Sequence, residues 1–152
     1  MVEVLPESMQ TSVGRLHANS LTASYARDLN KVLLEFSPNA KPLQFEEWES
    51  LASGNYLTVV STWRRGIVGM ATLVTFRIPT GIIGLVEDVA VLSTWRGQGL
   101  GEALVLDLIR EAKARQIKHI DLTSRRKRVE ANRLYQKLGF EYRETNNYRL
   151  TL

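Results

Sequence analysis

The feature that most constrains the fold is a glycine-rich turn between an apolar strand and an amphipathic helix. Residues 93–104, STWRGQGLGEAL, place three glycines at alternate positions, directly after the β-branched run GIIGLVEDVAVL. From Gly101 onward, apolar residues recur with helical spacing on one face, and Asp107 falls on the opposite, charged face. A further strand, KHIDLTS, follows that helix. A strand–helix–strand unit joins parallel neighbours through a right-handed crossover, so the sheet must contain a parallel pair.

The remaining elements follow from periodicity and breakers. Helical spacing predicts two early helices, LTASYARDLNKVLLEF and PLQFEEWESLA. A glycine-containing turn joins YLTVVSTW to IVGMATLVTFRI, which predicts an antiparallel hairpin. A last helix ends at Gly139, and a closing hairpin is expected to turn at Asn146 and Asn147. We therefore predict an α+β fold in a single domain, residues 1–152, with a central mixed, mostly antiparallel twisted sheet flanked by helices.

The composition limits the class of protein. The chain has 152 residues, of which 44% are hydrophobic and 24% are charged, as in an ordinary globular domain. It has no cysteine, which excludes disulfides, a thiolate metal site and a cysteine nucleophile. No apolar run is long enough to span a bilayer, and the start MVEVLPESMQ lacks the order of a signal peptide. We expect a soluble cytoplasmic protein with no membrane partner.

The glycine-rich turn has the chemistry of an anion site. A strand, a glycine turn and a helix start direct free backbone N–H groups and the positive end of the helix dipole at one point, which suits phosphate. A triphosphate loop needs lysine and a hydroxyl residue after its last glycine, but Glu102 and Ala103 follow here. The dinucleotide fingerprint needs G-x-G-x-x-G, whereas this chain has G-x-G-x-G. Neither of these two loops matches the sequence.

The turn resembles the signature of a known enzyme family. Residues 96–101, RGQGLG, resemble the R/Q-x-x-G-x-G/A pattern of the GNAT superfamily of acetyl-coenzyme A-dependent N-acetyltransferases. The resemblance extends to VEDVAV before the turn and to ANRLYQKLGF, which looks like the second motif of the family. It implies an acyltransferase that uses acetyl-coenzyme A, without a metal, and passes the acetyl group directly to a primary amine in a ternary complex.

The resemblance also implies which residues bind the cofactor. The strand backbone before the turn would pair with the pantetheine arm, the turn would hold the pyrophosphate, and an asparagine of the second motif would contact coenzyme A. The implied cofactor-binding residues are Val89, Ala90, Val91, Arg96, Gly97, Gln98, Gly99, Leu100, Gly101, Glu102 and Asn132. For Val89 and Val91 the alternative is simple packing of the strand, which we expect of their side chains in either case.

Tyr135 is the implied general acid. In the family, a tyrosine at this position of the second motif commonly protonates the departing thiolate. A thiol has a pKa of about 8.5 and a phenol of about 10, so a hydroxyl donor stabilises the thiolate without a large mismatch. Tyr135 also lies on the apolar stripe of its helix, so a role in the core is the alternative.

A base is expected because an alkylammonium, with a pKa of about 10, has no lone pair at neutral pH. Glu87 and Asp88 form the polar interruption of an apolar strand. Glu87 shares strand parity with Val89 and Val91 whereas Asp88 points the other way, which favours Glu87 as the catalytic base; a bulge would reverse this argument. Asp88 or a water molecule stays open as the base.

The acceptor itself carries no readable signature. We expect a small-molecule or peptide primary amine as the partner, and the sequence leaves a homodimer open. His17 and His119 belong to no metal-spacing motif, so no metal site is predicted. The basic run SRRKR, residues 124–128, is a solvated loop, a contact for coenzyme A phosphates or a nucleic-acid patch, although a nucleic-acid partner is not expected. The alternative function is a non-catalytic module that senses acetyl-coenzyme A or binds RNA on the same fold.

Overall fold

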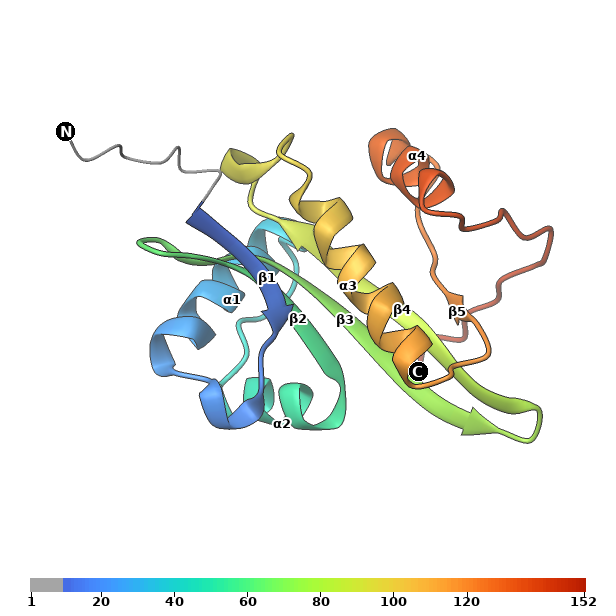
Figure 1. Ribbon diagram of the computed structural model, residues 1–152, viewed down its shortest axis with the longest axis horizontal. Coiled ribbons are helices and arrows are strands. Elements are labelled where there is room, and N and C mark those ends of the chain that lie inside the picture. The colour runs from blue at the N-terminus through green and yellow to red at the C-terminus, as the bar shows by residue number, and fades with distance from the viewer. Residues whose placement is uncertain (1–9) are drawn as a thin grey trace. The chain divides into compact units, whose positions relative to one another are not determined.

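The computed structural model describes residues 10–152, which divide into two compact units, one ending at Leu122 and one beginning at Thr123. The first unit contains a five-stranded sheet in sequence order, antiparallel except for its last, parallel pair (Figure 1). Its strands are β1 (Thr11–Arg15), β2 (Tyr56–Thr62), β3 (Gly66–Ile78), β4 (Gly81–Val91) and β5 (Ile120–Asp121). The predicted α+β class, with a mixed and mostly antiparallel sheet, is confirmed.

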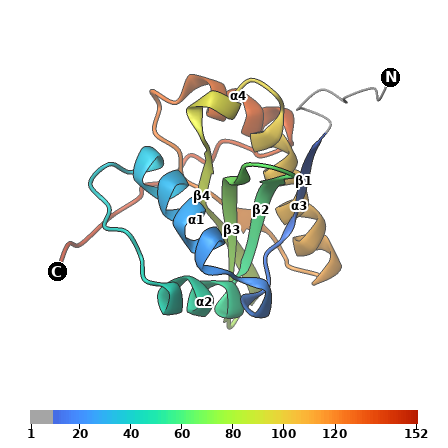
Figure 2. The ribbon, with the colours of Figure 1, turned by 90° about the vertical axis from the view of Figure 1, so that its left-hand side faces the viewer.

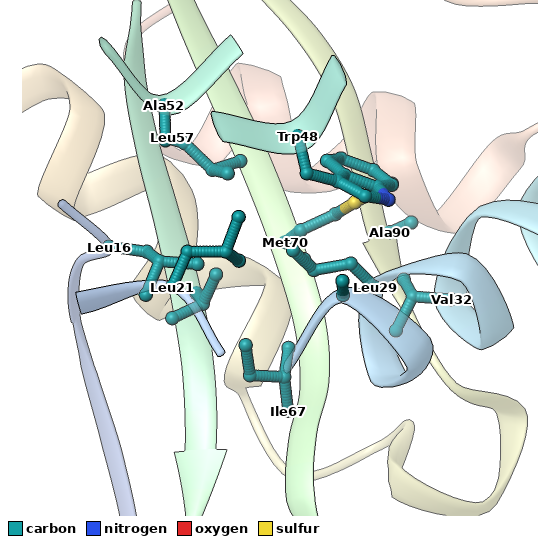
Figure 3. Packing of buried hydrophobic residues seen from close by; sticks show 12 residues of the cluster. Leu16, Leu21, Leu29, Val32, Trp48, Ala52, Leu57, Ile67, Met70 and Ala90 are labelled. Atoms are coloured by element: carbon teal, nitrogen blue, oxygen red, sulfur yellow. The ribbon is translucent and has the colours of Figure 1, made fainter. Parts of the chain in front are cut away.

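Helices cover both faces of this sheet (Figure 2). The first face carries α1 (Ala23–Phe36) and α2 (Phe45–Gly54), and the second carries α3 (Leu100–Ala114). All three helices lie where periodicity predicted them. Figure 3 shows the core of the first face, where Leu29 of α1 and Trp48 of α2 pack over Met70 of β3. Because all three side chains are almost fully buried, this core holds α1 and α2 in fixed positions against the sheet.

The edge strand β1 was not predicted from the sequence. It pairs with β2 from Thr11 opposite Thr62 to Arg15 opposite Thr58. The segment TSVGR is short and contains a single large apolar residue, so it has little of the alternation that identifies a strand. Its pairing with β2 therefore decides its conformation.

The face covered by α3 contains a buried charge that the sequence pattern placed wrongly. Asp107 was expected on the charged face of its helix, but only 3% of the residue is exposed. The Tyr56 hydroxyl donates a hydrogen bond of 3.0 Å to Asp107 Oδ2, and the Arg110 guanidinium pairs with the other carboxylate oxygen. Burial and the adjacent Asp107 carboxylate raise the pKa of Tyr56 to about 12. These partners satisfy the carboxylate, which is why the position can be polar and buried.

The second unit, residues 123–152, contains α4 (Val129–Lys137), which ends as predicted at a left-handed glycine, Gly139, with φ +92°. The predicted closing hairpin is wrong, because residues 140–152 form neither helix nor strand. Tyr142, Tyr148 and Leu150 are more than 80% exposed. An isolated two-stranded hairpin without a buried apolar face is only marginally stable in water, which accounts for the difference.

Two predictions from the sequence, on cellular location and on domain organisation, stay predictions. Residues 1–9, which include most of the segment that argued against a signal peptide, lie outside the described residues. From residue 10 onward, every helix is too short or too polar to cross a membrane. The cytoplasmic location and the single domain over residues 1–152 stay predictions.

Candidate active site

The glycine-rich turn links β4 to α3 through two left-handed residues. After a 3-10 turn at Ser93–Trp95, Gly97 and Gly99 adopt φ values of +77° and +76°. Gly101 lies in the first turn of α3 and has a helical backbone, so the left-handed conformation in this loop falls on the first two glycines. Residues with a Cβ rarely adopt such angles, which explains glycine at those two positions.

The turn leaves backbone donors unpaired at an open surface. The first backbone hydrogen bond of α3 runs from the Ala103 N–H to the Gly99 carbonyl, at 3.0 Å. Within residues 10–152 no acceptor is found for the N–H groups of Gln98, Gly99, Leu100 and Gly101. A Cβ built on Gly97 or Gly99 would meet no atom within 4 Å. Free donors, open space and the helix dipole together fit a pyrophosphate group.

Arg96 ties this turn to α1. Its Nε donates to the Val91 carbonyl at 3.0 Å, and its Nη2 lies 3.5 Å from Glu35 Oε1. The same Glu35 oxygen accepts the Ser93 N–H at 2.5 Å. No local pattern in the sequence distinguishes Glu35, because the contact joins residues 58 positions apart. Arg96 therefore holds the shape of the turn, and its contact with a cofactor stays a prediction.

The end of β4, residues 89–91, pairs with β3 but not with β5. The parallel pairing of β4 with β5 involves Gly84 and Leu85, whereas pairing with β3 continues to Val91 opposite Gly69. The backbone of residues 89–91 is therefore an edge on the side away from β3, as a pantetheine arm that pairs with the strand would need. The Ala90 side chain is buried in the core of the first face, so only its backbone groups could contact a cofactor.

A β-bulge in β4 overturns the parity argument for the base. Met70 pairs with Ala90, but Thr72 pairs with Glu87, so one residue of β3 lies opposite two residues of β4. Asp88, one of those two, has φ +50°. Because Met70 and Thr72 are two positions apart, Glu87 and Ala90 lie on the same face of the sheet. The expected shared parity of Glu87 with Val89 and Val91 is therefore wrong, and Glu87 lies on the face covered by α1 and α2.

A pocket of about 280 Å³ lies between that face and the two helices. Glu87 and the neighbouring Asp88 both line it, together with Trp48 and Met70, which lie side by side in Figure 3. The complete lining is Leu33, Leu43, Trp48, Leu51, Asn55, Met70, Thr72, Val74, Glu87 and Asp88. The bulge thus brings two carboxylates to one mostly apolar pocket, which strand parity alone would not allow.

Asn30 of α1 fixes one wall of this pocket. Its amide nitrogen donates to the Leu43 carbonyl and its oxygen accepts the Leu43 N–H, both at 2.9 Å. The same oxygen accepts the Trp48 indole N–H at 3.1 Å. No pattern in the sequence distinguishes this asparagine from a surface residue of α1. It positions two lining residues, Leu43 and Trp48, without lining the pocket itself.

We expect Asn30→Ala to lower the free energy of unfolding by about 2 kcal/mol, because it leaves the Leu43 backbone groups and the Trp48 indole without their partners. Thermal and urea unfolding measure the loss. Asn19→Ala is the matched control, since Asn19 accepts one long bond of 3.4 Å from Ser20 in an exposed setting. Equal stabilities of the two variants would contradict the role of Asn30.

The second unit holds the other two predicted site residues. The Tyr135 ring packs edge-on against Phe140, with centroids 5.9 Å apart. Burial raises the pKa of the Tyr135 phenol, and the Arg128 guanidinium opposes the shift. Asn132 Nδ2 donates to the carbonyls of Arg125 and Arg126, at 3.1 and 3.4 Å. Asn132 therefore anchors the backbone of the basic run, and its contact with coenzyme A stays a prediction.

Residues 10–152 contain no group of three or more histidine, aspartate or glutamate side chains that could hold a metal ion. The predicted site residues thus fall into the glycine-rich turn, the β4 edge and the pocket in the first unit, and Asn132 and Tyr135 in the second.

Three comparisons with known proteins bear on this arrangement. The sequence pattern of the acetyltransferase (GNAT) family matches residues 20–140. A glucosamine 6-phosphate N-acetyltransferase of Trypanosoma brucei brucei is 36% identical over 81 residues, so the match spans 51% of this chain and about half, 53%, of that relative. The crystal structure of a Trypanosoma brucei acetyltransferase superimposes with a TM-score of 0.76 at 28% identity, over 93% of this chain and 99% of the other.

More distant structures share the fold. A soil-metagenome aminoglycoside acetyltransferase, solved with trehalose, superimposes with a TM-score of 0.81 at 17% identity, over 95% of this chain and 97% of that one. The glucosamine-6-phosphate N-acetyltransferase of Arabidopsis thaliana reaches 0.75 at 18% identity, over 92% and 97% of the two chains. With the turn, the mixed sheet and the family match over residues 20–140, this chain belongs to the acetyltransferase (GNAT) family of acyltransferase enzymes.

Proposed function

We propose that this chain is an N-acetyltransferase that moves an acetyl group from acetyl-coenzyme A to a primary amine held in the pocket. The observation that carries the proposal is the bulge in β4, which turns Glu87 and Asp88 into a pocket on the strand that leads directly to the glycine-rich turn. One strand thus joins a candidate acceptor site to a candidate cofactor site.

The cofactor site is proposed from the free donors and the strand edge. The N–H groups of residues 98–101 would bind the pyrophosphate, with Gly97 and Gly99 leaving room for its approach. The backbone of residues 89–91 would bind the pantetheine arm along the β4 edge. Arg96 and Glu102 border the same turn, and Asn132 would contact coenzyme A from the second motif. When bound, acetyl-coenzyme A supplies the acetyl group as a thioester.

Two side chains would move protons in a direct transfer. Glu87 would accept the proton of the substrate ammonium, directly or through one water molecule, so that the amine gains a lone pair. Tyr135 would donate its phenolic proton to the departing sulfur. Its position in the second motif supports this role. Burial raises the pKa of the phenol, so the proton is present at neutral pH but is held more tightly than in a free tyrosine. The chain has no cysteine, which supports direct transfer over an acetyl-cysteine intermediate.

The proposal is tested by thiol release from acetyl-coenzyme A with amino sugars, aralkylamines, polyamines and peptides with free N-termini. Acetylated product, identified by mass spectrometry, is the expected result. The alternative is a non-catalytic module that senses acetyl-coenzyme A or binds RNA through the exposed basic run at residues 124–128. That alternative would be supported by cofactor binding without turnover of any amine, or by salt-dependent RNA binding.

We expect Gly99→Asn to weaken acetyl-coenzyme A binding about tenfold or more while the fold survives. Asparagine tolerates the left-handed backbone at φ +76°, and its side chain would occupy the open space in which the pyrophosphate is proposed to lie. Isothermal titration calorimetry with acetyl-coenzyme A measures the change.

Gly139→Asn is the matched control for this variant. Gly139 also has a positive φ, +92°, and open space around it, but it ends α4 and lies outside the proposed pyrophosphate loop. Its substitution should leave cofactor affinity unchanged. Equal affinities of wild type and a folded Gly99→Asn protein would remove the turn from the cofactor site.

A further inference from the structure

The walls of the pocket indicate what kind of amine it accepts. Most of the lining is apolar, contributed by leucines of α1, α2 and their connection and by Trp48, Met70 and Val74. Trp48 and Met70 are 3% and 2% exposed and lie together in Figure 3, so this part of the wall belongs to the packed core. A wall of this kind removes apolar surface of a ligand from water but gives few partners to the hydroxyls of a sugar.

The charge of the pocket is negative. Glu87 and Asp88 line it, and no lysine or arginine does. Within residues 10–152 neither carboxylate has a cationic partner or a hydrogen bond. Two carboxylates without a cationic partner attract an ammonium group and repel a phosphate. Both residues are exposed, so solvent and salt screen this interaction.

The size of the pocket is also restrictive. Its volume of about 280 Å³ lies near the lower end of the range for small-molecule sites, roughly 300–1,000 Å³. Leu51 is 37% exposed, so the pocket opens to solvent beside α2. A compact ligand with one cationic end and one apolar body fits these three properties together.

We infer that the acceptor is a compact aralkyl or alkyl primary amine, with its ammonium group at Glu87 and Asp88 and its apolar part against Trp48 and Met70. This inference rests on the proposed function and narrows its substrate class. It separates this chain from relatives named for glucosamine 6-phosphate, whose substrate carries a phosphate. In the transfer, an N–C bond forms and the thioester C–S bond breaks. The ammonium nitrogen loses two protons as it becomes an amide, one to the carboxylate or water before the attack and one after it. The sulfur gains one proton from Tyr135, which is reprotonated by the second, so that one proton is released overall.

The test compares three acceptors of graded chemistry: 2-phenylethylamine, glucosamine and glucosamine 6-phosphate. We expect kcat/KM to fall at least tenfold from the aralkylamine to glucosamine, and at least tenfold again to the phosphorylated sugar. Asp88→Asn keeps the size of the side chain and tolerates φ +50°, and it should raise KM for 2-phenylethylamine about tenfold. The same variant should narrow the difference between glucosamine and its phosphate.

Glu49→Gln is the matched control, because Glu49 is an exposed carboxylate of α2 that does not line the pocket. It should leave all three kcat/KM values unchanged. Glucosamine 6-phosphate turned over as well as 2-phenylethylamine, or an Asp88→Asn protein with unaltered selectivity, would overturn the inference and leave the proposed function intact. If wild type acetylates no amine, the proposed function fails, and calorimetric binding of 2-phenylethylamine against glucosamine 6-phosphate then decides the preference of the pocket.

Discussion

Glu87→Gln is expected to lower kcat by about 10²-fold or more, with little change in melting temperature or in acetyl-coenzyme A affinity. Glutamine keeps the shape of the side chain but accepts a proton from an ammonium group far less readily than a carboxylate does. The exposed Glu87 side chain makes no hydrogen bond or ion pair within residues 10–152, so its replacement removes no structural contact. Steady-state kinetics with a turned-over amine and differential scanning calorimetry provide the two measurements.

The pH dependence separates a base from a binding group. An alkylammonium has a pKa of about 10, so a growing fraction of the amine is already deprotonated as the pH rises toward that value. If Glu87 is the base, the loss of kcat in Glu87→Gln relative to wild type should become smaller between pH 7 and pH 9.5. If Glu87 only binds the ammonium, KM should rise while kcat stays near the wild-type value. A higher KM with an unchanged kcat would therefore move the role of base to Asp88 or to water.

Glu49→Gln again serves as the control, since it removes one negative charge from α2 without touching the pocket lining. A similar loss of kcat in both variants would show that net charge, and not a proton acceptor at Glu87, sets the rate.

Much of the fold could be predicted because its signals are local. Helical spacing and breakers identify α1, α2 and α3, and the glycines identify the turn between β4 and α3. The prediction of a closing hairpin was wrong because a hairpin depends on more than local sequence. The expected turn at Asn146 and Asn147 is a local signal, but a hairpin also needs a surface that buries one of its faces, and residues such as Tyr142 and Tyr148 stay exposed.

The geometry of the candidate site depends on contacts that the sequence does not reveal. The bulge exists because β3 and β4 shift register between Met70 and Thr72, and a register shift is a property of two strands. Parity along β4 alone therefore assigned Glu87 to the wrong face. Asn30 and Glu35 act through partners 13 to 61 positions away, so no local pattern could identify them. Asp107 reads as a surface residue until the Tyr56 hydroxyl is placed against it.

Tyr135→Phe is expected to reduce kcat about 10²-fold while cofactor affinity and melting temperature stay nearly unchanged. Phenylalanine keeps the ring, and therefore the edge-on contact with Phe140 at 5.9 Å between centroids, and deletes the acid. No hydrogen bond to the Tyr135 hydroxyl is found among residues 10–152, so the change breaks no structural bond there. A tyrosine that served only the core would behave differently, because deletion of its hydroxyl would leave turnover intact.

The measurement must be made where chemistry limits the rate. Single-turnover kinetics with preformed enzyme–cofactor complex exclude product release, which could otherwise hide a loss in the chemical step. Tyr142→Phe is the matched control, because Tyr142 lies in the same unit and is 81% exposed, so its phenol has no expected role. Wild-type single-turnover rates in the Tyr135→Phe protein would refute the assignment of Tyr135 as acid, and water would then protonate the departing sulfur. A lower single-turnover rate in Tyr135→Phe, with Tyr142→Phe at the wild-type rate, would support Tyr135 as the donor of the proton in the transition state.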